Sequence, residues 1–285
     1  MSIYYIDGEF IDADKAVLSF NDMAVLRGYG IFDFLRTYNG RPFYLEEHLE
    51  RFINSGRHVG LEVQQSLSEL TEIVMETLAR NNFRESNIRI VLTGGISPDS
   101  ITPQGNGRLA VMVTEKLDLP GWWYTDGAAV VSADVERYVP EAKSTNYMNA
   151  VLTQQKAKKQ GAIESIYVDR NGRVLEGTTT NIFLFMDGKW ITPGQDILPG
   201  ITRSVIMDLM KGEYEVDVRD ITREDILRAE EILITASNKE VVPVRQFDDK
   251  IIGDGTVGPE TRKVMEMFAA FTDEYGKGIA GKKAV

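Results

Sequence analysis

The sequence predicts an α+β fold of two domains, and three observations support this expectation. Hairpin-like strand pairs alternate with amphipathic helices along the 285 residues, as in folds that combine antiparallel sheets with helices. A Pro-Gly pair separates two apolar strands within 117–122, which is typical of a linker. The length suits one large domain or two modest ones. We therefore expect a small α+β domain over 1–116, a linker over 117–122 and a larger domain over 123–285.

The first domain is expected to contain hairpins and helices. Asp7-Gly8 and Asn39-Gly40 are dipeptides that suit two-residue hairpin turns. Apolar side chains then recur with helical period in two later stretches. The elements expected from these patterns are strands at 3–10, 36–44, 88–93 and 109–113 and helices at 45–59 and about 66–82.

The second domain is expected to alternate strands and helices. Asn171-Gly172 and Asp187-Gly188 predict turns between strands, and Pro199-Gly200 precedes a helical pattern. Pro259 is a favourable first-turn residue for a final helix. The expected elements are strands at 128–132, 165–169, 181–185 and 231–235 and helices at about 145–160, 202–210, 222–228 and from 259 onward.

The composition excludes several classes of function. The 32 basic and 43 acidic residues give a net charge of −11, and an acidic surface repels the phosphate backbone of nucleic acids. The C-terminal Lys277, Lys282 and Lys283 are too few for a basic arm, and we expect a frayed tail. With no cysteine and only two histidines, His48 and His58, thiolate chemistry and three-histidine metal sites are excluded, and no metal is expected.

The sequence also indicates where the protein works. No apolar stretch approaches the roughly 18 residues that a membrane-spanning helix needs, so no membrane association is expected. The N-terminal MSIYYIDGEFID has neither the basic region nor the apolar core of a signal peptide. Because cysteine is also absent, we expect a cytoplasmic protein.

Lys143 is the first candidate for chemistry. It lies in the irregular stretch 140–147, just before an expected helix. A lysine amine is a strong nucleophile towards aldehydes and forms Schiff bases with pyridoxal phosphate (PLP). A lone loop lysine is more often simply solvated, so its position alone does not decide between the two interpretations.

Glu176 is the second candidate. It follows a strand-like run and precedes the threonine-rich stretch 178–180. An anionic partner at the pyridine nitrogen of PLP keeps the ring protonated, and Glu176 could supply that charge. Such a stretch is also typical of a turn whose hydroxyl side chains cap their own backbone.

Three further segments could bind an anion. LPGITR (198–203) leads into a helix whose first backbone N–H groups would form an anion site, or it is an ordinary helix start. TASN (235–238) ends a strand, where small polar residues often face a ligand, although a plain loop is the alternative. Arg51 could grip a phosphate, or it could be a surface-helix residue paired with Glu47.

The order and spacing of these motifs carry a resemblance to a known family. The matching stretches are HLERF (48–52), EAKSTNY (141–147), EGTTTNIF (176–183), LPGITR (198–203) and TASNKEVVPV (235–244). In this combination the chain resembles the fold-type IV PLP enzymes, the class-IV aminotransferases, over nearly its whole length. That family contains D-amino-acid and branched-chain aminotransferases, (R)-amine transaminases and aminodeoxychorismate lyases. The resemblance implies a small α+β N-terminal domain, a larger pseudo-barrel C-terminal domain and a homodimer with shared active sites. It also implies transamination between amino acids and 2-oxo acids.

The resemblance further implies roles for individual residues. Lys143 would be the catalytic residue and would hold PLP covalently. Glu176 would pair with the pyridine nitrogen, and Leu198 would pack against the ring face. The other cofactor-binding residues would be Arg51, Ile201, Thr202 and Ser237 at the phosphate, Asn238 beside Ser237, and Tyr147 at the phenolic oxygen.

The motifs also indicate the amino donor. The spacing Lys-Ser-x-Asn from Lys143 and the run EGTTTN look like those of D-amino-acid aminotransferases, so we expect a D-amino acid substrate. The arginine–histidine pair that those enzymes carry in a Ser-Pro loop is absent from 97–101. The resemblance implies that the stretch 26–32, with Arg27 and Phe32, lines the substrate pocket and that Arg89 lies on a strand where the family often has a pocket arginine. We therefore expect Arg27 or Arg89 to bind the substrate carboxylate. The alternative for either arginine is a buried structural ion pair.

Three other functions stay open. A branched-chain L-amino-acid aminotransferase is the first, although that group has one more residue between its lysine and tyrosine than 143–147 allows. An aminodeoxychorismate lyase is the second, and its usual sequence around the carboxylate differs. A non-catalytic PLP-binding protein is the third, against which stands the presence of both Lys143 and Glu176.

Overall fold

The computed structural model describes residues 2–280 and divides the chain into two compact units. Within these residues the first unit comprises 2–117, Glu141–Tyr147 and 273–280, and the second comprises Asp118–Pro140 and Met148–Thr272. The first change of unit follows Leu117, at the start of the expected linker. A contiguous division of the chain does not anticipate that Glu141–Tyr147 belongs to the first unit. Of the expected C-terminal tail, Lys282 and Lys283 lie outside the described residues.

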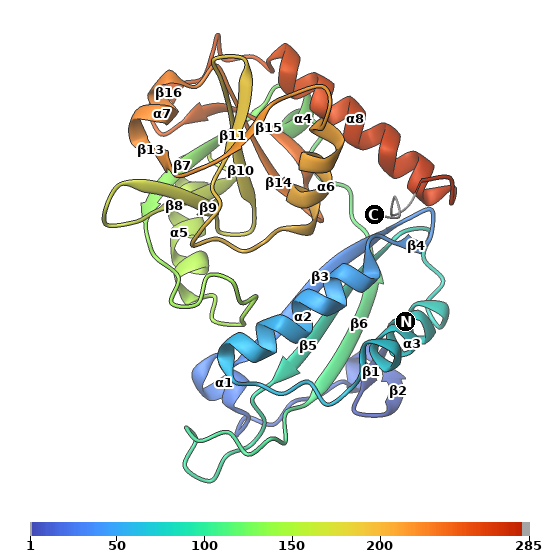
Figure 1. Ribbon diagram of the computed structural model, residues 1–285. Coiled ribbons are helices and arrows are strands. Elements are labelled where there is room, and N and C mark those ends of the chain that lie inside the picture. The colour runs from blue at the N-terminus through green and yellow to red at the C-terminus, as the bar shows by residue number, and fades with distance from the viewer. Residues whose placement is uncertain (1, 281–285) are drawn as a thin grey trace. The chain divides into compact units, whose positions relative to one another are not determined.

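The first unit is built on a six-stranded antiparallel sheet with the order β2-β1-β6-β5-β3-β4 (Figure 1). Its strands are β1 Ile3–Ile6, β2 Glu9–Asp12, β3 Gly30–Tyr38, β4 Arg41–Pro42, β5 Ser86–Thr93 and β6 Leu109–Glu115. Its helices are α1 Met23–Arg27, α2 Leu45–Val59 and α3 Leu67–Ala79, with a short 3₁₀ helix at Ala13–Lys15.

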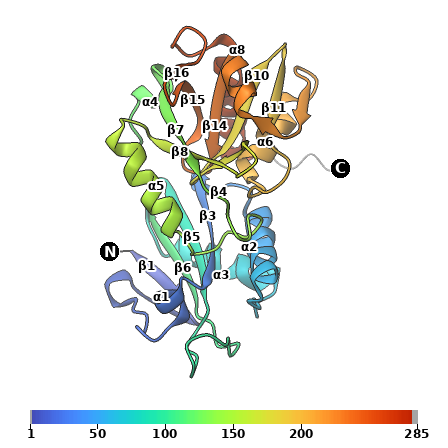
Figure 2. The same cartoon turned by 90° about the vertical axis from the view of Figure 1, so that its left-hand side faces the viewer.

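Alternate residues of this sheet face the two long helices. Ile31 and Leu35 of β3 lie opposite Leu92 and Ile88 of β5, and all four side chains are buried. They pack with Leu49 and Phe52 of α2 and Leu70 and Val74 of α3 in one apolar cluster. Figure 2 shows α2 and α3 on one side of the sheet. Because strand side chains alternate between faces, β3 residues of even number point to the opposite face.

Local signals set the ends of these helices. Ser66 caps α3, and its hydroxyl and the Glu69 carboxylate form a reciprocal capping box. Gly60 ends α2 with a left-handed φ of 72°, a conformation that glycine adopts without steric cost. The expected helix at 45–59 is therefore confirmed with the same bounds.

Three hairpin turns follow the dipeptides that the sequence indicated. Asp7-Gly8, Asn39-Gly40 and Asp187-Gly188 all have positive φ at both residues. This is the backbone of the type I′ turn, which suits the right-handed twist of the flanking strands.

The second unit is built on a ten-stranded, largely antiparallel sheet. Its hydrogen-bonded order is β12-β11-β10-β14-β15-β7-β8-β9-β13, with β16 paired to β15. The strands are β7 Ala128–Asp134, β8 Glu164–Val168, β9 Arg173–Gly177, β10 Asn181–Met186, β11 Lys189–Thr192, β12 Val216–Val218, β13 Ile221–Thr222, β14 Glu231–Ala236, β15 Glu240–Phe247 and β16 Lys250–Ile251. The helices are α4 Trp122–Thr125, α5 Met148–Lys159, α6 Ile201–Met210, α7 Arg223–Arg228 and α8 Pro259–Gly276, of which 273–276 belong to the first unit.

This sheet curls into a half-barrel around its own core. The short turn 178–180 joins β9 to β10, although β14, β15, β7 and β8 separate those two strands in the sheet order. The sheet must curl for so short a turn to connect them. The side chains enclosed include Ile166 of β8, Ile182 of β10 and Ile234 of β14, all with no exposed area. Apolar area removed from water stabilises a fold by about 25 cal/mol per Å², so burial of these side chains is the main contribution to the stability of this unit. The expected α+β fold with a larger pseudo-barrel is confirmed.

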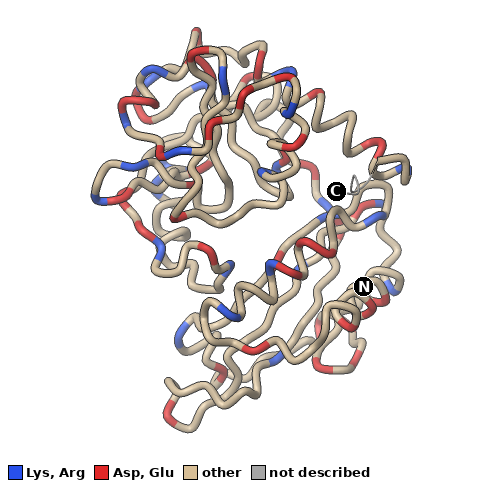
Figure 3. Tube along the Cα trace, in the orientation of Figure 1, with Lys and Arg blue, Asp and Glu red and all other residues tan. Residues whose placement is uncertain are grey.

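Charges are spread along both units. Figure 3 shows acidic and basic positions interspersed along the trace of residues 2–280, without an extended basic segment. Across the same residues, no helix combines the length and the apolarity needed to cross a membrane.

Candidate active site

Lys143 is held by its backbone against the first unit. The Phe32 N–H donates to the Lys143 carbonyl at 2.9 Å, and the Thr145 N–H donates to the Gly30 carbonyl at 2.8 Å. The Lys143 N–H donates to the Ser55 hydroxyl of α2 at 3.0 Å. Three bonds to β3 and α2 therefore fix the root of the lysine side chain.

Three of the side chains that the sequence singled out in this unit lie around the Phe32 ring. The Lys143 Nζ lies 4.8 Å and the Arg89 guanidinium 5.0 Å from the ring centroid. The Tyr147 ring packs edge-on at 5.5 Å between centroids. Arg89 pairs with Phe34 in the β3–β5 register, so it lies on the sheet face that α2 does not cover. An amine and a guanidinium thus meet on one aromatic ring.

Arg51 lies on the other face of β3 and is buried, with 8% of its area exposed. Its Nε and Nη2 donate to the two Asp33 carboxylate oxygens at 2.9 and 2.8 Å. The interpretation of Arg51 as a surface residue of the helix is therefore wrong, since its side chain is buried against the Asp33 carboxylate. Asp33 was not anticipated, although a buried arginine requires a carboxylate partner.

His48 completes this buried cluster through a 2.6 Å contact between its Nδ1 and Asp33. Burial raises the pKa of Asp33, but Arg51 and His48 together outweigh that effect and hold this pKa well below its ordinary value. Burial lowers the pKa of His48, and the charges of Arg51 and Lys143 act in the same direction against the opposing pull of Asp33. Asp33 is therefore an anion beside a neutral imidazole, so Nδ1–H donates to the carboxylate.

Arg27 ends α1 and is exposed. Its guanidinium donates to the Leu26 carbonyl at 2.9 Å. Gly28 follows in the left-handed conformation, with φ of 65°, and its carbonyl accepts from the Thr145 hydroxyl at 2.9 Å. The loop after Arg27 therefore packs against the segment that carries Lys143. Arg27 and Arg89 are both exposed, so neither is the buried structural ion pair weighed as the alternative.

Glu176 lies within β9 of the second unit and is 4% exposed. Arg137 donates to one of its carboxylate oxygens at 2.7 Å, and the Leu198 N–H donates to the other at 2.9 Å. Arg137 also donates to the Pro140 carbonyl at 2.8 Å. The carboxylate is thus fixed in place and balanced by a cation. Arg137 lies outside the sequence motifs and was not anticipated, although a buried carboxylate calls for such a partner.

The α6 N-terminus is built around Gly200. Gly200 is the N-cap of this helix, and no side chain of the described residues caps it. Thr202 is 3% exposed in the first turn. A Cβ at Gly200 would collide with the amide oxygen of Asn181, whose Nδ2 donates to the Leu198 carbonyl at 3.0 Å. The first N–H groups of this ten-residue helix, Ile201 among them, form the kind of end that binds anions.

Ser237 and Asn238 lie in the turn between β14 and β15. Ser237 is half-buried and Asn238 is exposed. Glu240 follows the turn with a φ of 58°, a rare backbone for a residue with a side chain. The structure therefore places both residues at the end of a core strand, as the sequence predicted.

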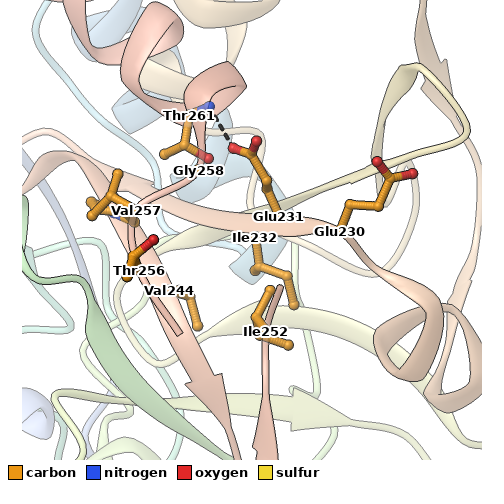
Figure 4. A pocket seen from close by; sticks show the side chains of 10 residues that line it. Glu230, Glu231, Ile232, Val244, Ile252, Thr256, Val257, Gly258 and Thr261 are labelled. Atoms are coloured by element: carbon orange, nitrogen blue, oxygen red, sulfur yellow. Dashed lines mark hydrogen bonds between the residues drawn. The ribbon is translucent and has the colours of Figure 1, made fainter. Parts of the chain in front are cut away.

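A small, open recess lies elsewhere in this unit, beside the N-terminus of α8 (Figure 4). The Glu231 carboxylate accepts from the Glu260 and Thr261 N–H groups there and caps the helix. Glu231 begins β14, whereas Ser237 follows its end. The recess therefore contains none of the predicted site residues. Among residues 2–280, no cluster of three or more His, Asp or Glu side chains has the geometry of a metal site.

Comparison with known proteins assigns the same motifs to one family. The family model described as amino-transferase class IV matches residues 30–247. A protein of Methanocaldococcus jannaschii, named as a branched-chain-amino-acid aminotransferase, is 34% identical over 95% of this chain and 97% of its own length. The D-alanine aminotransferase of Staphylococcus haemolyticus is 32% identical over 96% of this chain and 99% of its own length.

Solved structures agree with this assignment. The branched-chain amino acid aminotransferase of Escherichia coli superposes with a TM-score of 0.91 at 26% identity and covers 99% of this chain and 97% of its own. A second branched-chain amino acid aminotransferase, from the organism abbreviated T.th. and determined with pyridoxamine 5′-phosphate, has a TM-score of 0.89 at 28% identity and covers 98% and 95%.

Proposed function

Because the chain belongs to the class-IV aminotransferases, we propose that it uses PLP to transfer an amino group between an amino acid and a 2-oxo acid. The observation that carries this proposal is the placement of the Lys143 amine, 4.8 Å from the Phe32 ring and anchored to β3 and α2. A solved relative contains the pyridoxamine form of the same cofactor.

The donor set fits this cofactor. Lys143 offers the amine that an aldehyde requires. Glu176 offers a carboxylate for a protonated ring nitrogen, and Arg137 donates to that carboxylate at 2.7 Å. The uncapped α6 N-terminus with Thr202 offers N–H groups and a hydroxyl for a phosphate. We assign Arg51, Ile201, Ser237 and Asn238 to the same group, Leu198 to its ring face and Tyr147 to its phenolic oxygen.

The roles of this chain's residues follow from that assignment. When bound, PLP supplies a protonated aromatic ring that withdraws electrons from the amino acid's α-carbon. Lys143 holds the cofactor and moves the proton at that carbon. Glu176, bound to Arg137, keeps the proton on the ring nitrogen. The Leu198 N–H fixes the second carboxylate oxygen and so the direction of the first.

We assign the substrate carboxylate to Arg89 first and to Arg27 second. A carboxylate leaving water needs a charged or multiply hydrogen-bonded partner, because burying it bare is far too costly. Arg89 lies over the same Phe32 ring as Lys143, and within residues 2–280 its guanidinium forms no ion pair. D-amino acids are our main substrate proposal, supported by the lysine spacing and by the D-alanine aminotransferase relatives.

A branched-chain L-amino-acid substrate is the second candidate, favoured by the loop near Asp99. The pKa of Asp99 lies well below its ordinary value because its carboxylate accepts four hydrogen bonds. The donors are the Thr102 N–H, the Thr102 and Ser97 hydroxyls and the Ile101 N–H. An anion thus lies where D-specific relatives carry a cationic pair. Solved branched-chain enzymes also superpose closely on this chain.

A half-reaction separates the two substrates. The PLP form is mixed separately with D-alanine, D-glutamate, L-leucine and (R)-phenylethylamine, and the loss of its visible absorption band is followed. We expect rapid conversion by D-amino acids, slowed about 10- to 100-fold in Arg89→Ala by the loss of a charged hydrogen bond. Arg57→Ala, which removes an exposed arginine of α2, is the control. Conversion by L-leucine alone would refute the D-specific proposal.

We also propose a homodimer with shared active sites, located in the cytoplasm. The family resemblance supports the first statement, and the absence of cysteine is consistent with the second. Light scattering of the purified protein tests the dimer.

A further inference from the structure

Lys239 is a buried lysine next to the Ser237-Asn238 turn. Only 9% of its area is exposed. Its Nζ lies 3.1 Å from the carboxylate of Glu164, which is fully buried, and donates to the Thr179 hydroxyl at 2.5 Å. Lysine is almost never buried unless it is paired.

Glu164 occupies an unusual place for a charge. It begins β8 and has the same parity as Ile166 and Val168, which face the half-barrel core. Its two oxygens accept from the hydroxyls of Thr178 and Thr179 as well as from Lys239. Since burying two charges costs several kcal/mol per ion before pairing, an apolar pair would serve stability at least as well.

The Lys239–Glu164 pair connects two turns that carry proposed cofactor-binding residues. Lys239 belongs to the β14–β15 turn with Ser237 and Asn238. Thr178 and Thr179 belong to the β9–β10 turn, which begins two residues after Glu176. These turns are far apart in sequence, and the Lys239 ammonium contacts both through Thr179 and the carboxylate.

The Lys239 backbone is also fixed. Its N–H donates to the Ala236 carbonyl at 3.2 Å, and its carbonyl accepts from the Tyr124 hydroxyl at 3.1 Å. The ammonium therefore extends from an anchored turn, so that a change at Nζ is transmitted to the neighbouring Ser237 and Asn238.

We propose that Lys239 is a positioning residue that, through Glu164 and Thr179, holds the Ser237-Asn238 turn and the turn after Glu176 in the arrangement that binds PLP. This role rests on the proposed function. It accounts for a buried charge pair that stability alone does not require.

The test separates positioning from stability. The full-length chain, freed of cofactor, is titrated with PLP, and the circular dichroism of the bound cofactor is recorded; urea unfolding is measured on the cofactor-free protein. The variants are Lys239→Met, Glu164→Gln and the double variant. We expect Lys239→Met to weaken PLP binding about tenfold or more and to alter the cofactor's dichroism.

The double variant distinguishes the two roles. It leaves no unpaired buried charge, so we expect its urea midpoint to return towards wild type while PLP binding stays weak. Wild-type PLP affinity in the double variant would show that only charge balance matters and would overturn the proposal. If Lys239→Met does not fold, the Thr179→Val variant provides the test of the positioning role. This variant keeps the Lys239–Glu164 ion pair, and we expect several-fold weaker PLP binding with little loss of stability.

The controls distinguish this role from the proposed function. A wild-type chain that does not bind PLP overturns the proposed function and this role with it. A wild-type chain that binds PLP, with Lys239→Met and Thr179→Val binding equally well, overturns this role alone.

Discussion

At the scale of single residues, two of the charges proposed to act on the cofactor, Arg51 and Glu176, are each balanced by a partner outside their own motif. Asp33 binds Arg51, and Arg137 binds Glu176. Both pairs are largely buried, where removing one partner leaves an uncompensated charge at a cost of about 3–5 kcal/mol. The sequence named one member of each pair, because the motif contains Arg51 and Glu176 but not their partners.

Glu176→Gln tests the proposed role of the carboxylate. Glutamine keeps the shape but removes the negative charge opposite the ring nitrogen, so we expect turnover to fall about 100-fold or more while PLP remains bound. Steady-state kinetics and the visible spectrum measure the two effects. Glu136→Gln, which neutralises an exposed partner of Arg170, is the matched control. Wild-type turnover in Glu176→Gln would remove this role.

His48 predicts a pH dependence of stability. Burial lowers the pKa of His48 in the folded chain, so below about pH 6.5 the unfolded chain binds a proton that the folded chain does not. The free energy of unfolding is thus highest above that pH and decreases as the pH falls, with a slope of up to about 1.4 kcal/mol per pH unit. Urea unfolding between pH 7.5 and 5 should show a shallower slope in His48→Gln than in wild type. An equal slope in both proteins contradicts a neutral buried His48, and exposed His58→Gln serves as the control.

At the scale of elements, helices and turns with strong local sequence signals were predicted, and elements with weak signals were not. The helix Leu45–Val59 and the three hairpin dipeptides follow from periodicity and from turn residues that tolerate positive φ. The helix expected to begin near 145 starts at Met148. The residues before it, Lys143 included, pair with β3 instead, and sequence periodicity does not reveal such long-range pairing.

Several elements that the sequence missed are short, although the eight-residue strand Glu240–Phe247 and most of the nine-residue strand Gly30–Tyr38 were missed as well. The five-residue helix Met23–Arg27 is below the length at which periodicity is informative. The strands Lys189–Thr192, Val216–Val218, Ile221–Thr222 and Lys250–Ile251 exist because neighbouring strands provide their hydrogen bonds. Whether such short segments form strands depends more on the neighbouring strands than on their own side chains.

Gly200→Ala tests the start of α6. The added Cβ would meet the amide oxygen of Asn181, so that the first turn and the Leu198 carbonyl bound to Asn181 must shift. We expect a loss of about 1–3 kcal/mol in the free energy of unfolding and weaker PLP binding. Gly121→Ala, with nothing near its added Cβ, is the control. Unchanged PLP affinity in Gly200→Ala would remove α6 from the phosphate site.

At the scale of the whole molecule, the chain matches its relatives from end to end. The curated relatives are covered over 97% and 99% of their lengths, so the comparison extends over complete proteins of this family. The family and the fold class were accessible from sequence because the motifs that indicate them are local. The proposed substrate role of Arg89 depends on side-chain placement on β5, which motifs do not encode.

The most direct test of this account is to find which lysine holds the cofactor. The protein is incubated with PLP, reduced with borohydride, digested and examined by mass spectrometry. We predict a single phosphopyridoxyl label on Lys143, its absence in Lys143→Ala, and loss of transamination in that variant. A label on another lysine, such as the buried Lys239, or wild-type turnover in Lys143→Ala, would contradict the account.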